Sequence, residues 1–413
     1  MKKFKWMLLA AAMTVLVGCG VPAVIPTEPA TENRTTDPTE EILWQETETA
    51  KKYQNQQLRF WSILAEDTPE AALLHQAAAV FEAQTGAKVV LTFTDGDADA
   101  LEKALTAGQA DLIQMPDMKT AKNQAEFLAD LTPVMPSQAA AMGFITEELG
   151  KPLCIPQVPQ IHAVYYNKAA FESCGITKLP DNWADFMRVC KTLKENGWTP
   201  LTVDSRDAPV LTELLLRSKL SALQLQKLKE QGGWQDSSGA MAAAEEILEF
   251  LKAGYLATGA PGKYPQSPRD LILSDIAMVF STNVEVVAGM QHAGTTLDVG
   301  VFPCPGSGVV LNGQMLAVAA ESAHQEAAMD LVLLLTRGEF DQLSADEWSG
   351  VPMDPANAST ISGAQEILSR GSIVSLGWWN PEMEEILLRI WQSKYENAEA
   401  FAAQLEQYSI SVG

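Results

Sequence analysis

The sequence predicts an α/β fold, and two observations support this. Strand patterns and helix patterns alternate from residue 58 onward, in the order strand, helix, strand, helix, strand. The 413 residues are also enough for two or more domains, and 47% hydrophobic with 20% charged residues suits a folded chain. Ligands of α/β sheets collect at the carboxyl ends of parallel strands, so we look for a site there first.

The first residues of the chain resemble an export signal. Lys2, Lys3 and Lys5 precede an apolar run over 6–17, which is shorter than the about 20 residues that a membrane span needs. The run ends in Leu-Val-Gly-Cys, which resembles a bacterial lipobox and implies a signal peptide over 1–18 and a lipid on Cys19. Residues 19–57 are rich in proline and threonine without an apolar period, so we expect a disordered tether to the membrane.

The first elements after this tether are three strands separated by two helices. Leu58–Trp61 is the first expected strand, and Thr68-Pro69 followed by Glu70 predicts a helix start. Gly86 predicts the end of that helix, and the next elements are a strand over 88–94, a helix over about 98–107 and a strand over 111–114. Polar or aromatic candidates for ligand contact lie at or after the strand ends: Trp61, Ser62, Glu66 and Asp117.

Residues 155–168 are expected to cross from one part of the fold to another. Pro156 and Pro159 cannot donate to a central sheet ladder, whereas 162–166 is an extended apolar run. Downstream, a buried strand over 276–280 ends in Ser281-Thr282-Asn283, and Asn312-Gly313 precedes a strand over 315–320. Another strand is expected over 298–302, and helices over about 182–196, 211–228, 241–252, 323–336, 364–369, 381–391 and 396–408.

Several short motifs occur in a fixed order along the chain. A Phe-Glu-x-x-Thr-Gly run occupies 81–86, Ala-Val-Tyr-Tyr-Asn-Lys occupies 163–168, and Asn-Gly-Trp-Thr-Pro-Leu occupies 196–201. Together with the lipobox they resemble the family 1 extracellular solute-binding proteins of bacterial ABC importers, from residue 58 to about 408. The resemblance implies a two-lobe, periplasmic-binding-protein-like fold of type II with a ligand cleft between the lobes. Lobe one would comprise 58–158 plus 282–322, and lobe two 159–281 plus 323–413.

The same resemblance implies a lipid-anchored receptor outside the cytoplasmic membrane. It would be a monomer that captures a small solute, a mono- or oligosaccharide, by hinge closure and delivers it to an ABC permease. Gln160 takes a hinge position where some sugar binders carry a carboxylate, and Asn283 takes a position where relatives often have tryptophan. Asn312 offers an amide before a strand, and Trp378 and Trp379 lie where late aromatic residues stack on sugars.

Other functional classes find less support in the sequence. There is no G-x-S-x-G, H-E-x-x-H or Walker motif, so we expect neither catalysis nor a cofactor. The four histidines have no metal-ligand spacing, and a net charge of −23 argues against nucleic acid as a partner. Two alternatives stay open: a sensing or interaction lipoprotein on the same fold, and a binder of a non-sugar solute such as a metal chelate or a polyamine.

The cysteines after Cys19 leave disulfide pairing open. Cys154, Cys174, Cys190 and Cys304 allow three full pairings, between which the sequence does not choose. We expect few or no structural disulfides.

Overall fold

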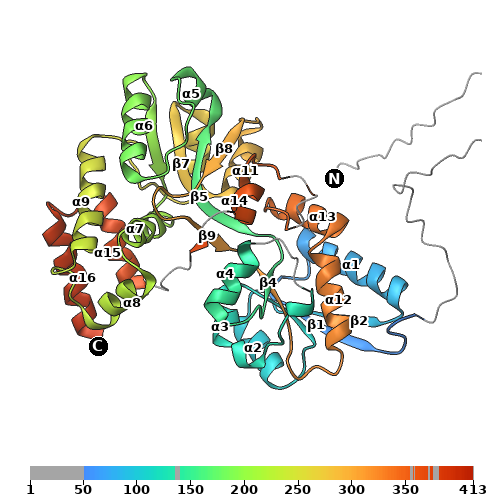
Figure 1. The fold of residues 1–413 in the computed structure, drawn as a ribbon. Helices are drawn as coiled ribbons and strands as arrows, with labels where there is room; N and C mark the ends of the chain where they lie inside the picture. The colour runs from blue at the N-terminus through green and yellow to red at the C-terminus, as the bar shows by residue number, and fades with distance from the viewer. Residues whose placement is uncertain are drawn as a thin grey trace, which may run out of the picture. The chain divides into compact units, whose positions relative to one another are not determined.

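The computed structural model describes residues 51–134, 140–353, 357, 359–370, 373–374 and 381–412. The expected signal peptide, Cys19 and most of the expected tether lie outside these residues. The chain from Ala50 onward groups into one compact unit, in which helices flank two sheets (Figure 1). Within the described residues, no helix combines the length and the apolar character that crossing a bilayer requires.

The first sheet has five strands, which are in spatial order β2 (Lys88–Phe93), β1 (Gln57–Ser62), β3 (Leu112–Met115), β10 (Met315–Val318) and β4 (Ile155–Pro156). The strands β1, β2 and β3 are parallel, and two helices connect them, α1 (Pro69–Thr85) and α2 (Ala98–Thr106). The strand β10 is antiparallel to both of its neighbours. The alternation of strands and helices that the sequence predicts for this region is confirmed.

The second sheet has six strands. Five of them are hydrogen-bonded neighbours in the order β11 (Ile373–Val374), β9 (Val309–Asn312), β5 (Gln160–Asn167), β7 (Ile276–Thr282) and β6 (Thr199–Val203), and the sixth, β8 (Val299–Phe302), pairs with β5. The strand β7 runs along one edge of β5, and β9 and β8 share the other edge. The eight-residue β5 is therefore the centre of this sheet.

The remaining described helices are α3 (Met118–Asn123), α4 (Ala140–Leu149), α5 (Lys168–Ser173), α6 (Trp183–Glu195), α7 (Ala208–Arg217), α8 (Ala222–Gln231), α9 (Ser238–Lys252), α10 (Ser267–Leu273), α11 (Asn283–Ala293), α12 (Gln325–Leu335), α13 (Gly338–Trp348), α14 (Ala364–Arg370), α15 (Pro381–Trp391) and α16 (Ala398–Val412). Two 3₁₀ turns cover Ala125–Phe127 and Thr132–Val134.

Local capping explains where several helices begin and end. Thr68 accepts a hydrogen bond from the Ala71 amide at the start of α1, and Gly86 ends that helix with a φ of 77°, as the sequence predicts. The single helix expected over 211–228 is divided, because Ser221 forms a capping box with Gln224 and starts α8 as a new helix.

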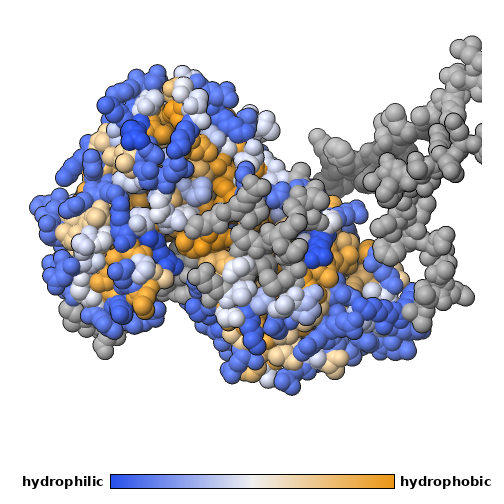
Figure 2. Space-filling view, in the orientation of Figure 1, coloured by the Kyte–Doolittle hydropathy of each residue, from blue (hydrophilic) through white to orange (hydrophobic). Residues whose placement is uncertain are grey.

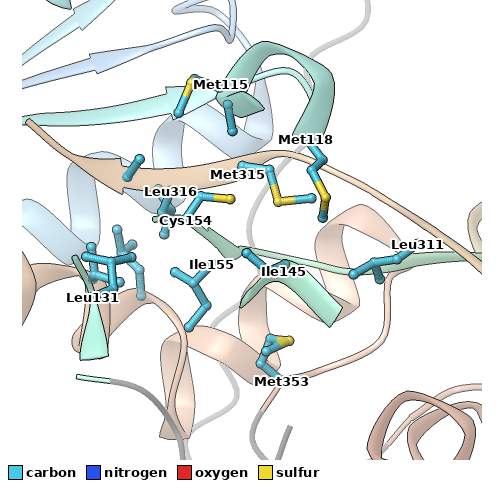
Figure 3. Packing of buried hydrophobic residues seen from close by; sticks show 14 of the residues in the cluster. Met115, Met118, Leu131, Ile145, Cys154, Ile155, Leu311, Met315, Leu316 and Met353 are labelled. Carbon is cyan, nitrogen blue, oxygen red and sulfur yellow. The ribbon is translucent and has the colours of Figure 1, made fainter. Parts of the chain in front are cut away.

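Buried apolar side chains form two clusters. The first surrounds the first sheet and continues onto one face of the second sheet through residues such as Ile161, Tyr165 and Val279, and the second covers the other face of the second sheet. Figure 3 shows part of the first cluster, where β3, β10 and β4 meet α4 through Met115, Met315, Ile155 and Ile145. The second cluster lies under α6, α7, α9, α15 and α16. Hydrophilic residues cover much of the outer surface over α6, α9 and α16 (Figure 2), as expected for helices that turn one apolar face inward.

The end of the expected tether is ordered in the structure. Tyr53 is buried, stacks on Phe81 at 6.2 Å between ring centroids, and donates from its hydroxyl to Asp330 at 2.6 Å. Lys52 forms an ion pair with the same carboxylate at 2.8 Å. Residues 51–57 therefore belong to the folded body and not to the tether, because Tyr53 gains more from burial than the chain loses in freedom.

Sheet membership also differs from the expected lobe boundaries. The strands β8 and β9, which we expected in lobe one, pair with β5 in the second sheet, because β5 is long enough to pair with both. The helix α12, which we expected in lobe two, packs on β10 and α1 through its apolar face and so belongs with the first sheet. The division into two lobes itself stays a prediction.

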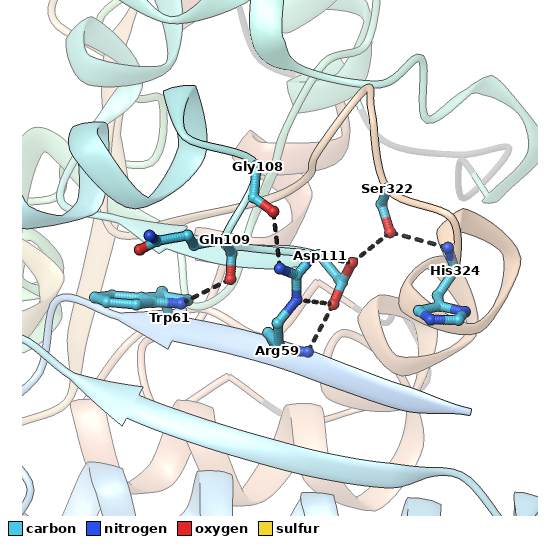
Figure 4. A network of polar contacts seen from close by, with 7 residues as sticks. All are labelled: Arg59, Trp61, Gly108, Gln109, Asp111, Ser322 and His324. Atoms are coloured by element: carbon cyan, nitrogen blue, oxygen red, sulfur yellow. Dashed lines mark hydrogen bonds and ion pairs between the residues drawn. The ribbon is translucent and has the colours of Figure 1, made fainter. Parts of the chain in front are cut away.

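A buried ion pair fixes the start of β3 (Figure 4). The buried carboxylate of Asp111 accepts from Arg59 Nε at 2.9 Å and from Ser322 Oγ at 2.7 Å. Burial opposes ionisation of Asp111, but the hydrogen bonds and charge of Arg59 outweigh it and lower the pKa of the carboxyl. The indole of Trp61 donates to the carbonyl of Gln109 at 3.1 Å in the same region.

Candidate ligand-binding site

Residues 155–168 join the two sheets, as the sequence predicts. The strand β4 belongs to the first sheet and β5 to the second, and residues 157–159 link them. Pro156 lies in an edge strand and Pro159 lies outside the strands, where neither removes a hydrogen bond from a central ladder. A second link, Gly313-Gln314, returns from β9 to β10, and the Gln157 amide donates to the Gln314 carbonyl at 3.0 Å.

Gly313 allows these two links to lie against each other. Its φ is 116°, and a Cβ at this position would lie 2.7 Å from the Val158 carbonyl oxygen. A third contact comes from the segment after α13, where the Val351 amide donates to the Pro159 carbonyl at 3.0 Å. The links are therefore closely packed backbone with little room for side chains.

A polar cavity of about 290 Å³ lies beside these links. Strands of the second sheet, the helix α11 and the segments after β3, after β6, before α10 and between β9 and β10 supply its lining, which is Pro116, Asp117, Gln160, His162, Arg206, Asp207, Tyr264, Thr282, Glu285, Asn312, Gly313 and Gln314. Almost every lining side chain can donate or accept a hydrogen bond, so the cavity suits a polar solute.

A buried hydrogen-bond chain forms one wall of the cavity. Asn312 Nδ2 lies 2.8 Å from His162 Nδ1, and His162 Nε2 lies 3.2 Å from Asp207 Oδ1. Because the Asn312 amide nitrogen donates, Nδ1 of His162 accepts and Nε2 carries the proton that reaches Asp207. Ser281 donates to the other Asp207 oxygen at 3.2 Å. This chain holds the Asp207 carboxylate and the Asn312 amide in place.

A second group joins Tyr264, Glu285 and Arg206. The Tyr264 hydroxyl donates to the Glu285 carboxylate, and the Arg206 guanidinium lies 4.6 Å from the centre of the Tyr264 ring. Burial and the hydrogen bond to Glu285 raise the pKa of Tyr264. The phenol therefore stays neutral and remains a donor at neutral pH.

Three of the predicted contact residues come together in this cavity. Asp117 begins α3 and accepts from the Thr120 amide and hydroxyl, both at 2.8 Å and both through Oδ1. Gln160 and Asn312 face each other as register partners of β5 and β9.

The other predicted contact residues do not line this cavity. The Trp61 indole donates a hydrogen bond to the Gln109 carbonyl, and Glu66 is exposed in the loop before α1. Ser62 is buried and donates to Gln114 at 2.5 Å. Asn283 is also buried, where it accepts from the Ile161 amide at 2.7 Å and donates to the Ser349 carbonyl at 2.9 Å. The polar groups of Ser62 and Asn283 are thus hydrogen-bonded inside the fold. Trp378, Trp379 and Cys19 lie outside the described residues.

Most of the residues that line the cavity were not predicted as contact residues from the sequence. His162 stood out only as part of an apolar strand, although it is a polar member of the wall. Thr282 belongs to the polar triplet that ends β7, so its position at a strand end was a usable signal. Four further lining residues carried no pattern that could have identified them: Arg206, Asp207 and Tyr264 in loops and Glu285 in α11.

The described residues hold no group of three or more histidine, cysteine, aspartate or glutamate side chains that could bind a metal ion. Their cysteines, Cys154, Cys174, Cys190 and Cys304, are free thiols.

Comparison with known proteins gives a family for the chain. The model of the bacterial extracellular solute-binding proteins matches residues 65–337, which is more than half of the sequence. No curated protein matches.

Many solved structures share the fold. RafE from Streptococcus pneumoniae in its apo form is 14% identical with a TM-score of 0.67, and 86% of this chain covers 97% of that one. The sugar-binding protein MalE from Xanthomonas citri is 16% identical with a TM-score of 0.67, at 86% and 97% coverage. The GacH receptor of Streptomyces glaucescens is 18% identical with a TM-score of 0.56, at 86% and 98% coverage.

These relatives are binding proteins and not enzymes, and their two-sheet α/β architecture is the one described above. The family match covers α1 to α12, including the links between the sheets and every residue that lines the polar cavity. The chain belongs to the bacterial extracellular solute-binding proteins.

Proposed function

We propose that the protein captures a small polyhydroxylated solute, a mono- or oligosaccharide, in the polar cavity beside the links. The observation that carries the proposal is the lining itself, which offers carboxylates, amides and one guanidinium from the second sheet, from α11 and from segments at the ends of strands of both sheets. Micromolar binding needs about 8 kcal/mol, whereas one hydrogen bond contributes about 0.5–1.5 kcal/mol. Many polar contacts are therefore needed, and the cavity supplies them.

Related structures support the saccharide class. RafE is described in complex with raffinose, the GacH receptor in complex with acarbose, and a further neighbour is a chitin oligosaccharide binding protein. Carboxylates such as Asp117 and Asp207 accept hydrogen bonds from sugar hydroxyls, and the Tyr264 ring offers a face to sugar C–H groups.

The proposed mechanism is closure of two lobes about the links. A solute that contacts both sheets favours the closed form, because only that form makes all of the contacts. The body would be held outside the cytoplasmic membrane by a lipid on Cys19, and the closed form would deliver the solute to an ABC permease.

One feature favours a second candidate, an organic cation such as a polyamine. Asp117, Asp207 and Glu285 line the cavity against one positive side chain, Arg206. An excess of carboxylates attracts ammonium groups as well as hydroxyls.

Calorimetric titration of the purified chain with neutral saccharides and with spermidine separates the candidates. We expect a saccharide to bind and Asp117→Asn to weaken it about tenfold, since asparagine keeps the helix cap but loses the charged acceptor. Asp236→Asn, at an exposed acid between α8 and α9, serves as the matched control and should bind as the parent does. Binding of spermidine without any saccharide would overturn the sugar class in favour of the cation.

A further inference from the structure

A second cavity of about 330 Å³ lies next to the polar cavity. Residues 263–266 and the helices α10 and α11 enclose it, with Lys263, Tyr264, Pro265, Gln266, Arg269, Glu285, Ala288, Gly289 and His292 as its lining. Tyr264 and Glu285 line both cavities, so their hydrogen-bonded pair is the wall between the two.

The charge of the second cavity differs in sign from that of the first. Lys263 and Arg269 are positive, His292 can become positive, and Glu285 is the one carboxylate. That carboxylate already accepts a hydrogen bond from the Tyr264 hydroxyl. In a chain with a net charge of −23, a cavity with an excess of positive side chains is unusual and attracts anions.

Arg269 has a donor that the protein leaves unused. Its Nε is buried and has no hydrogen-bond partner among the described residues. A buried donor without an acceptor is costly, and a planar guanidinium fits a carboxylate better than any other side chain does. Arg269 also lines the cavity, so its guanidinium adds a positive charge that would attract a carboxylate held there.

Small residues keep the cavity open. Ala288 is an exposed residue of α11 in the lining, next to Gly289. A Cβ on Gly289 would lie 3.1 Å from Ile272 Cδ1 and 3.3 Å from the backbone of Pro268, so the glycine lets α11 approach α10 closely. A large side chain at Ala288 would instead fill the cavity without entering the core.

We propose that the solute is an acidic saccharide, whose neutral hydroxylated part occupies the first cavity and whose carboxylate occupies the second. The carboxylate would accept from Arg269 and Lys263, across the wall formed by Tyr264 and Glu285. This inference rests on the proposed function, since it assigns the class of saccharide to the same site.

A disaccharide of one neutral hexose and one hexuronate, compared with its methyl ester, tests the inference, because the two share their hydroxyl groups but differ in charge. Calorimetric titration of the purified chain should show the acid binding at least tenfold tighter than the ester. Arg269→Gln and Ala288→Trp should each abolish this preference, the first by removing the cation and the second by filling the cavity. Lys227→Gln, which removes an exposed cation from α8, is the control and should keep the preference.

The outcomes separate the two proposals. Equal affinity of the parent for acid and ester would overturn the acidic class while leaving saccharide binding intact. A preference for the acid that persists in both variants would overturn the second cavity as its site. Failure of every neutral and acidic saccharide to bind the folded parent would overturn the proposed function and this inference with it.

Discussion

Asp204 shows how a single buried carboxylate supports both cavities. It follows β6, and its Oδ1 accepts from the Ser267 amide at 3.0 Å and from the Ser267 hydroxyl at 2.9 Å. Arg206 and Asp207, which line the first cavity, lie just after Asp204. Ser267 starts α10, which lines the second cavity, so this contact holds the two segments together. Burial raises the pKa of Asp204 to about 6, although the hydrogen bonds from Ser267 oppose the rise.

The raised pKa of Asp204 predicts a dependence of stability on pH. The folded protein binds more protons than the unfolded chain between the unfolded value of 3.8 and the folded value of about 6. The contribution of Asp204 is fully present below about pH 4 and is lost as pH rises through 6. We therefore expect the unfolding free energy of the parent to fall by about 2 kcal/mol relative to that of Asp204→Asn between pH 4 and pH 7.

Urea unfolding of parent and variant across this range measures the difference. A free-energy difference that stays constant from pH 4 to pH 7 would contradict the assignment of the raised pKa to Asp204.

At the scale of elements, the two antiparallel links are the feature on which the site depends. Residues 157–159 and Gly313-Gln314 lie in contact, and Gly350 adds a third close approach, since a Cβ there would lie within 2 Å of Val158 Cγ1. Segments that adjoin strands of both sheets can line one cavity because these links hold the ends of β5, β9 and β10 together.

Gly313→Ala tests the importance of this packing. Alanine at a φ of 116° is strained, and its Cβ would meet the Val158 carbonyl, so we expect a loss of about 2–4 kcal/mol in unfolding free energy. Gly96→Ala is the matched control, because Gly96 has a φ of 84° but nothing within 4 Å of a Cβ. The unfolding free energy of the control variant should fall by about 1 kcal/mol. Equal losses measured by chemical unfolding would show that the contact between the links adds nothing.

Sequence patterns predicted some elements and missed others for physical reasons. The helices α1 and α15 were predicted closely, because caps, prolines and apolar periods mark their ends. The strand β9 and the helix α10 were missed, since both are short and β9 pairs with β5, which is far away in the sequence. Asp117, Gln160 and Asn312 were found because they lie at strand ends or in the crossing segment. Tyr264 and Glu285 come together only through the packing of α11 beside α10, which no local pattern encodes.

At the scale of the whole molecule, two sheets meet beside one polar cavity, and a few backbone links join them. The first apolar cluster reaches from the first sheet onto one face of the second, and the second cluster packs helices against the other face. This arrangement does not follow chain order, because the first sheet takes strands from residues 57–115, 155–156 and 315–318. The proposed closure would bend the backbone links between the sheets.

Hydrogen exchange with and without a bound saccharide tests the central claim, that the polar cavity beside the links holds the solute. We expect slower amide exchange on binding at 116–120, 157–162, 204–207, 264–266 and 312–314, which contain or adjoin the lining residues. Exposed segments such as 221–227 on α8 should exchange at an unchanged rate. Saccharide binding with unchanged exchange at the cavity segments and protection elsewhere would contradict the account.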